Sequence, residues 1–314
     1  MGLIAWLIHR GVLDIRAVAG ALTRWPLVLV VAVLFCAQTA VLAYRWDILL
    51  RAQDAGLRYR DAFSLTMIGL LFNLVSPGSV GGDLIKSFYV HRHARERRAE
   101  AVATIVLDRV IGMITLFLVA SVAAVPALFF SAGNARLRAL ALGAVAAAAI
   151  GLGGLAAAIR ISRAAAAREH SNFAIRFTLR AFGSLLIYRD RPAALLRPMA
   201  VSTVGWLLPC AAFYAAALAA GAPAFSVGLL FLVPLGLMTT ALPVSPGGIG
   251  VGQVAFAELF RIASNGEYSF GANAYTVLQA VQILGSLSGF FFYLGWRRDL
   301  RASSPPEVPT STPA

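Results

Sequence analysis

The sequence predicts an all-α polytopic membrane protein with about eight transmembrane helices, and three observations support this fold class. Hydrophobic residues make up 59% of the 314 residues and only 13% are charged, whereas soluble domains carry about 25% charged residues. Apolar runs long enough to cross a bilayer recur along the chain. Two similar Gly/Pro-rich stretches, SPGSVGGDLIK at residues 76–86 and SPGGIGVGQ at residues 245–253, interrupt these runs. Such breaks at matching places indicate two repeat-like halves around a transport site.

The expected spans follow from the apolar runs in chain order. Residues 1–21 hold a run too short to cross, and Trp6 favours an interfacial segment over a cleaved signal peptide. The second span begins near Asp61 and ends in the first break, and the seventh is short, so either one could be a re-entrant hairpin instead of a full crossing. Apart from the second, the spans are expected at about residues 22–44, 104–128, 137–159, 198–220, 225–242, 250–262 (the seventh) and 274–296.

The integral membrane domain is expected to cover residues 1–301, and two segments of the chain stand apart from its spans. Residues 160–196 form an Arg-rich connector. Its apolar residues at helical spacing favour an amphipathic helix in the membrane interface, and a solvated cytoplasmic loop fits equally well; these residues are Ile175, Leu179, Phe182 and Leu186. Residues 302–314 are rich in Pro, Ser and Thr and are expected to be disordered.

The basic residues indicate an orientation. Eight spans would place both termini on one side, and the positive-inside rule assigns that side to the cytoplasm. Three basic residues then lie in the N-terminal flank, six in 86–109, eight in 160–197 and three in the C-terminal flank, which is 20 of the 27 Lys and Arg. The first outer loop fits least well, because it carries four Arg: Arg45, Arg51, Arg58 and Arg60.

Several function classes lack support in the sequence. The basic excess lies in loops between apolar runs, so topology and anionic lipids explain it better than nucleic acid does. Cys36 and Cys210 lie in apolar segments without metal or redox spacing, and the four His lie in basic flanks. No nucleophile–base set, metal cluster or nucleotide-binding loop is present, so we expect neither an enzyme nor a bound cofactor or metal.

The two breaks carry the expected chemistry. A new helix should start near Asp83 and another near Gly250, and a helix N-terminus with glycines beside it can bind an anion such as phosphate. Lys86, the only lysine, and Arg109 can add full charges. We therefore expect a site for the headgroup of a phospholipid or a polyprenyl phosphate. The candidate substrate-binding residues are Asn73, Pro77, Gly78, Gly81, Gly82, Asp83, Lys86, Asp108, Arg109, Pro246, Gly247, Gly248, Gly250, Gln253 and Glu258.

Some of these candidates also have structural interpretations. Asn73 can satisfy backbone groups at the first break, Asp83 can be an N-cap, and Lys86 can extend to the membrane interface. Asp108 can pair with Lys86, and Glu258 lies three residues before Arg261, which favours a local ion pair. If transport is coupled to ions, the acidic candidates are Asp83, Asp108 and Glu258.

These motifs resemble a known family. The runs FNLVSPGSVGGDLIKSFYVHRH and EAVATIVLDRVIGMITLFL, followed by ALPVSPGGIGVGQVAF, are similar to the flippase-like membrane domain of lysylphosphatidylglycerol synthases. The resemblance extends over about residues 25–298 and implies a multi-pass protein of the bacterial inner membrane. In the synthases this domain is thought to move an aminoacylated phospholipid between leaflets. Gln253 departs from the family pattern, which has an acidic residue there.

The resemblance implies a lipid flippase. The sequence ends at Ala314, so a stand-alone member without the soluble aminoacyltransferase domain is expected, and the lipid stays open. The alternative is an accessory subunit that does not transport but presents a lipid to a separate synthase or glycosyltransferase. The expected partners are therefore lipids with anionic or phosphate headgroups and, under the alternative, such an enzyme; the oligomeric state is open.

Overall fold

The computed structural model describes residues 2–9, 11–54, 56–76, 80–93, 98–130, 134–166, 193–223, 227–240, 244–266 and 269–302. The elements of these residues are all helices, which confirms the predicted all-α class. In chain order they are α1 (Gly2–His9), α2 (Ile15–Thr23), α3 (Trp25–Ala52), α4 (Tyr59–Asn73), α5 (Val80–His93), α6 (Arg98–Ala123), α7 (Val125–Phe130), α8 (Ala135–Ala166), α11 (Ala193–Ala219), the 3₁₀ helix η1 (Val227–Phe231), α12 (Leu232–Thr240), α13 (Val251–Ala263), α14 (Gly271–Leu287) and α15 (Gly289–Ala302).

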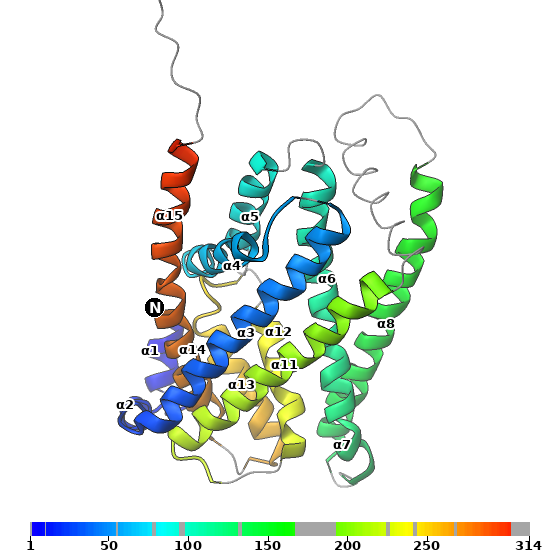
Figure 1. Cartoon of the computed structure of the whole chain (residues 1–314). Coiled ribbons are helices and arrows are strands. Elements are labelled where there is room, and N and C mark those ends of the chain that lie inside the picture. The colour runs from blue at the N-terminus through cyan, green and yellow to red at the C-terminus, as the bar shows by residue number, and fades with distance from the viewer. Residues whose placement is uncertain are drawn as a thin grey trace, which may run out of the picture.

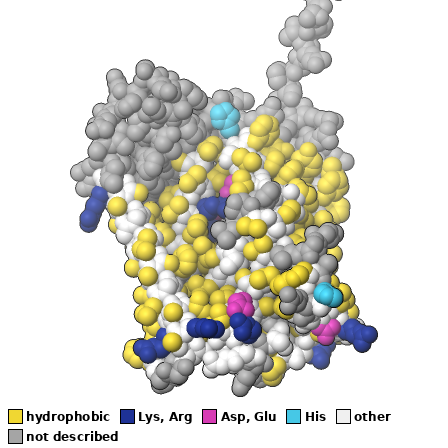
Figure 2. Space-filling model, turned by 180° about the vertical axis from the view of Figure 1, so that it is seen from behind, with side chains coloured by type: hydrophobic (Ala, Val, Ile, Leu, Met, Phe, Trp, Pro, Cys, Tyr) yellow, Lys and Arg dark blue, Asp and Glu magenta, His cyan; other side chains and the backbone are white. Residues whose placement is uncertain are grey.

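Five long apolar segments form the bundle. In the described part of the chain, five helical segments are long and apolar enough to cross a membrane, and they lie in α3, α6, α8, α11 and the pair α14–α15. Their outward side chains are apolar and exposed, for example Val122, Ile150 and Leu284. Figure 2 shows hydrophobic side chains over the middle of one face and charged ones mainly near its lower edge. The protein is thus a multi-pass membrane protein.

The other three expected spans are short helices around the two breaks. A bilayer crossing needs about 20 helical residues, whereas α4 has 15, α12 has 9 and α13 has 13. In each half the two helices that flank the break pack on one another, α4 on α5 and α12 on α13. This is the re-entrant arrangement that the sequence left open at residues 61–76 and 250–262.

The long helices alternate in direction. Arg24 before α3 donates to the carbonyl oxygen of Leu218 near the end of α11, and Trp46 late in α3 contacts Thr104 early in α6. We call the end where α3 and α8 finish and α6 begins the upper end, and the opposite end the lower end (Figure 1). Five alternating segments place the start of α3 at the lower end and the finish of α15 at the upper end. Eight crossings would have placed them on one side.

The two breaks approach from opposite ends and meet inside the bundle. The chain enters α4 from the upper end of α3 and leaves α5 beside the start of α6, whereas it enters η1 and leaves α13 at the lower end (Figure 1). The backbone N–H of Gly247 in the second break donates to the carbonyl oxygen of Ser76 in the first, at 3.4 Å. The structure therefore joins two motifs that lie 169 residues apart in the sequence (245 minus 76).

Aromatic rings and glycines pack the lower half tightly. The ring of Phe256 on α13 stacks between those of Phe213 on α11 and Tyr275 on α14. Gly252 allows this contact, because a Cβ there would lie 2.2 Å from a ring carbon of Tyr275. The second break is thus fixed against two of the long helices.

Some expectations concern segments at the edges of the described residues. In the connector at 160–196, α8 continues to Ala166 and α11 begins at Ala193, and residues 167–192 lie outside the described part, as do residues 303–314 of the tail. At the N-terminus the expected interfacial segment forms the short helices α1 and α2, with Trp6 half exposed. Asp14 caps α2 by accepting hydrogen bonds from the N–H groups of Arg16 and Ala17.

Candidate functional site

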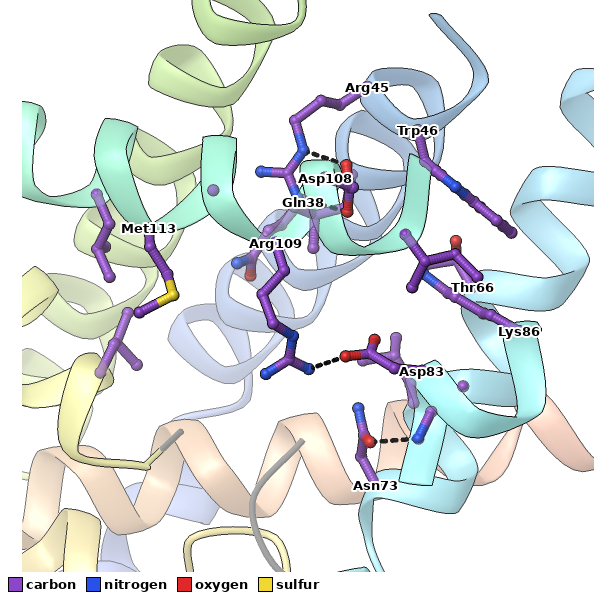
Figure 3. Close-up of a pocket in the computed structure, with 18 of the residues that line it drawn as sticks. Gln38, Arg45, Trp46, Thr66, Asn73, Asp83, Lys86, Asp108, Arg109 and Met113 are labelled. Carbon is purple, nitrogen blue, oxygen red and sulfur yellow. Dashed lines mark hydrogen bonds and ion pairs between the residues drawn. The ribbon is translucent and has the colours of Figure 1, made fainter. Parts of the chain in front are cut away.

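A cavity of about 320 Å³ lies beside the first break and contains five charged side chains. Long helix α3 supplies Arg45, α5 supplies Asp83 and Lys86, and α6 supplies Asp108 and Arg109 (Figure 3). Helices α11 and α12 close the cavity with apolar and polar side chains. Charged groups within an apolar bundle are costly unless they pair with one another or bind a ligand, so the partner of each charged side chain matters.

Arg45 and Asp108 form a buried ion pair between α3 and α6. The Arg45 Nε and Nη2 atoms donate to the two carboxylate oxygens of Asp108 at 2.7 and 2.9 Å, and Nη1 donates to the Ser202 hydroxyl on α11 at 2.7 Å. Arg45 is 5% exposed. Gly112 makes room for it, because a Cβ there would lie 3.0 Å from Nη1. This pair links three long helices and positions the wall of the cavity.

Asp83 and Arg109 form a second and more accessible pair. The Arg109 Nη2 and Asp83 Oδ2 atoms are 2.6 Å apart, and each side chain is about one-third exposed (36% and 34%). Asp83 lies in the first turn of α5, which begins at Val80, so it is not the N-cap of that helix. Because Asp108 and Arg109 are consecutive on α6, they reach different partners, one on α3 and the other on α5.

Lys86 contributes the remaining charge. Its Nζ lies 4.6 Å from the centre of the Trp46 ring, a cation–π contact. In the described part of the chain Nζ makes no hydrogen bond or ion pair. Its stem passes Gly69, where a Cβ would lie 3.4 Å from Cε. Lys86 therefore points into the cavity with no carboxylate within ion-pair distance among the described residues, although Asp108 and Asp83 attract its charge from farther away. The direct ion pair of Asp108 is with Arg45.

The charges of the described residues that line the cavity sum to one positive charge. Three cations, Arg45, Lys86 and Arg109, face two carboxylates, Asp83 and Asp108. A net charge inside a low-dielectric bundle is unfavourable, and an anion that enters the cavity would neutralise it. The arrangement is suited to binding one negative charge.

The glycines of the first break serve close packing. The N–H of Gly82 donates to Asn73 Oδ1 at 2.7 Å, which satisfies a backbone donor in the first turn of α5. A Cβ on Gly82 would lie 2.6 Å from the carbonyl oxygen of Gly69, and one on Gly81 would lie 2.6 Å from Ser76 Cβ. Asn73 thus has the structural role considered above, and the Gly82 N–H is already engaged. Pro77 and Gly78 lie outside the described residues.

The second break is held by a chain of amides. The N–H of Gly250, before α13, donates to Gln253 Oε1 at 2.7 Å. Gln253 Nε2 donates to Gln279 Oε1 at 2.8 Å, and Gln279 Nε2 donates to the carbonyl oxygen of Gly247 at 3.0 Å. Gly247, Gly248 and Gly250 have φ of +58°, +69° and +88°, which other residues rarely adopt. A side chain thus engages one N–H at this helix start, as at the first break, and the side-chain cations are the full positive charges that the site offers to an anion.

A second cavity of about 190 Å³ adjoins the first. It lies beside Gly247, and its polar lining consists of hydroxyls and amides, including those of Asn73, Tyr275 and Gln279. Gln38 on α3 and Gln282 on α14 line both cavities. The structure thus connects a charged cavity at the first break with an uncharged polar cavity at the second.

Other sequence candidates lie outside the charged cavity. Glu258 pairs with Arg261 on the exposed side of α13, which confirms the local interpretation. Pro246 is exposed, and Gly248 packs against Thr240. These residues shape the second break or its surroundings without joining the charged groups.

The sequence missed Arg45, Trp46, Gln38 and Gln282. Arg45 was assigned to an outer loop because the first span was ended at residue 44. The apolar residues Trp46, Leu49 and Leu50, all buried, continue the helical period beyond it and were the signal that α3 extends to Ala52. Gln38 and Gln282 gave no signal, since a lone amide inside a span has many uses.

Comparison with protein families adds a decisive observation. A family model described as the lysylphosphatidylglycerol synthase TM region matches residues 1–288. The chain belongs to this family. Neither a comparison with curated proteins nor one with solved structures found a match. The charged cavity and both breaks therefore lie in the part of the chain that the lysylphosphatidylglycerol synthase TM family covers.

Proposed function

We propose that this member of the lysylphosphatidylglycerol synthase TM family is a flippase-like transporter that moves a phosphate-bearing lipid between the leaflets of a bacterial inner membrane. Phosphate binds in the charged cavity between Lys86 and Arg109, and the lipid tails stay in the bilayer. The observation that carries the proposal is the net positive charge of this cavity, with Lys86 unpaired among the described residues. Neutralisation by a phosphate would remove an unfavourable buried charge.

The arrangement of the breaks supports transport over simple binding. The chain enters α4 and leaves α5 at the upper end, and it enters η1 and leaves α13 at the lower end. The two breaks meet at the hydrogen bond from the Gly247 N–H to the Ser76 carbonyl oxygen. The two cavities share Gln38, Asn73, Thr240 and Gln282, so a headgroup has polar contacts on both sides of the break-to-break contact. Breaks of this kind in opposed halves are typical of alternating access.

The charge distribution favours the upper end as the cytoplasmic side. The described helices α3, α5, α8 and α15 finish at the upper end, and the sequence stretches at or after these finishes, 51–60, 92–98, 160–197 and 297–301, hold three, four, eight and three basic residues, which is 18 of 27. The stretches 10–24 and 136–138 and Arg261 hold six, and Arg45, Lys86 and Arg109 line the cavity. This orientation places Arg51, Arg58 and Arg60 on the basic side and moves residues 10–24 to the other side.

Transport by purified protein in vesicles tests the proposal. Fluorescent phosphatidylglycerol is placed in both leaflets, and a membrane-impermeant reductant quenches only the outer pool. We expect the wild type to expose the inner pool, and Lys86→Met to slow this by about tenfold or more, which corresponds to about 1.4 kcal/mol. Arg60→Met, which removes an exposed cation outside the cavity, should transport like the wild type.

The same measurement can overturn the proposal. Wild-type protein that binds phosphatidylglycerol tightly but moves neither it nor any other phosphate-bearing lipid tested would favour the accessory role. Equal transport by wild type and Lys86→Met would show that the charged cavity is not the headgroup site.

A further inference from the structure

We propose that the headgroup is a phosphodiester of an uncharged polyol, such as glycerol or a sugar, and that Gln38 and Gln282 bind its hydroxyls. This inference rests on the proposed function and specifies its substrate class. It combines two observations that are independent of one another: the charge of the first cavity and the unpartnered amides on the wall that both cavities share.

The charge of the first cavity selects a single negative charge. Its five charged groups sum to one positive charge, and a phosphodiester carries one negative charge. A phosphate monoester carries about −1.5 to −2 at pH 7, and a diphosphate at least as much, so each would leave an uncompensated negative charge beside Asp83 and Asp108. Burying that charge is unfavourable.

The shared wall offers hydrogen bonds without charge. Gln38 and Gln282 line both cavities, and in the described part of the chain neither side chain makes a hydrogen bond. Each amide has two N–H donors and an acceptor oxygen, and a hydroxyl both donates and accepts. Two such amides in a cavity wall are costly to leave without partners once water is excluded, and a polyol satisfies both of their functions.

The carboxylates of the site are not available to an amine. Asp108 is held by Arg45 and Asp83 by Arg109. The second cavity has no carboxylate or cation among its described lining residues. Gln253, beside it, is an amide already bound to Gly250 and Gln279. A headgroup with an ammonium would therefore have to compete with an arginine for each carboxylate of the site, in a lining that carries three cations.

Competition between lipids in native mass spectrometry tests this inference. The purified protein receives an equimolar mixture of phosphatidylglycerol, phosphatidylethanolamine and phosphatidic acid with the same acyl chains. We expect the wild type to retain phosphatidylglycerol about tenfold over each of the others, which corresponds to about 1.4 kcal/mol. The double variant Gln38→Leu/Gln282→Leu should reduce the preference over phosphatidic acid to the part that the charge of the first cavity provides. Gln53→Leu, the same change outside both cavities, should keep the full preference.

A gain-of-function variant strengthens the test. Gln282→Glu places a carboxylate in the shared wall, so it should shift retention toward phosphatidylethanolamine, whose ammonium it can pair with. No shift, together with unchanged selectivity in the double leucine variant, would overturn the assignment of the amides.

The outcomes separate this inference from the proposed function. Loss of both anionic lipids in Lys86→Met, together with wild-type retention of phosphatidic acid equal to phosphatidylglycerol, would refute the polyol class and leave the phosphate site intact. Retention that Lys86→Met does not alter would refute both. Glycerophosphoglycerol, the headgroup without acyl chains, is added in a separate arm. Displacement of the lipid by equimolar glycerophosphoglycerol would support the headgroup chemistry but identify a water-soluble ester as the ligand, against a flippase.

Discussion

The guanidinium of Arg45 on α3 donates two hydrogen bonds to the carboxylate of Asp108 on α6 and a third to Ser202 on α11. One buried side chain therefore connects three of the five long apolar segments. The pair contributes no net charge to the cavity, and it holds the wall from which Arg109 extends toward Asp83. The two consecutive residues therefore differ: Asp108 is held in the buried pair with Arg45, whereas Arg109 is one-third exposed and pairs with Asp83 on the accessible side of the cavity.

Removal of one partner from the Arg45–Asp108 pair should destabilise the fold strongly. Asp108→Asn leaves the Arg45 charge buried without compensation, and such changes typically cost about 3–5 kcal/mol. We expect a marked fall in the thermal unfolding temperature of the purified protein. The double variant Arg45→Met/Asp108→Leu removes both charges and should recover most of the loss. Unfolding of Asp108→Asn at the wild-type temperature would contradict this account of the pair.

A methyl group at Gly82 should force α4 and α5 apart. The Cβ of Gly82→Ala would lie 2.6 Å from the Gly69 carbonyl oxygen and 2.9 Å from the Asn73 amide. Overpacking of this kind costs about 1–3 kcal/mol. Gly143→Ala on α8 is the matched control, because a Cβ there has nothing within 4 Å and alanine is the better helix former. Thermal unfolding of both variants compares them, and equal stability would show that the first break is not tightly packed.

The amide chain of the second break should contribute to stability. Gln253→Leu leaves the Gly250 N–H and Gln279 Oε1 without their partners, and each unsatisfied buried group costs about 1–3 kcal/mol. Gln38→Leu removes an amide that has no hydrogen bond among the described residues, so its unfolding temperature should stay near that of the wild type. If the two variants unfolded at the same temperature, the chain of amides would have no structural role.

Labelling from one side of the membrane should separate Arg60 from Arg261. Arg60, in the first turn of α4, belongs to the upper end, and Arg261, in the last turn of α13, belongs to the lower end. Arg60→Cys and Arg261→Cys are made in a Cys36→Ala/Cys210→Ala background. A membrane-impermeant maleimide should label Arg261→Cys in intact cells and Arg60→Cys only after the membrane is opened. Eight full crossings would instead place both residues outside, and labelling of both in intact cells would favour that topology.

The sequence predicted the class and the breaks because those depend on composition and local chemistry. Apolar length decides which segments can cross, and Gly and Pro decide where a helix stops, so α5 and α13 begin within a few residues of the expected Asp83 and Gly250. The number of membrane crossings was harder to predict from the sequence. Helices α4, α12 and α13 have 15, 9 and 13 residues, and the structure shows that each adjoins a break and packs on the helix at the other side of that break.

The site was predicted only in part, because its charges pair between distant segments. Lys86, Asp83 and Arg109 were candidates, but the partner of Asp108 proved to be Arg45, which lies 63 residues away. The helix starts at the breaks were expected to be open to an anion. Asn73 instead accepts from the N–H of Gly82, and Gln253 accepts from the N–H of Gly250, so a side chain engages one donor at each start. A single side chain three to nine residues away decides this, and sequence spacing alone does not show which way it turns.

The contact between Ser76 and Gly247 has a consequence for the distance that a polar group must travel. A bilayer presents about 30 Å of hydrocarbon to a crossing headgroup. One break reaches inward from each end, and the two polar cavities share lining residues beside the backbone hydrogen bond that joins the breaks. For a headgroup that crosses by this route, the free-energy barrier depends on the contact between the two breaks and not on the thickness of the bilayer. Crossing by this route should be insensitive to the acyl-chain length of the surrounding lipids.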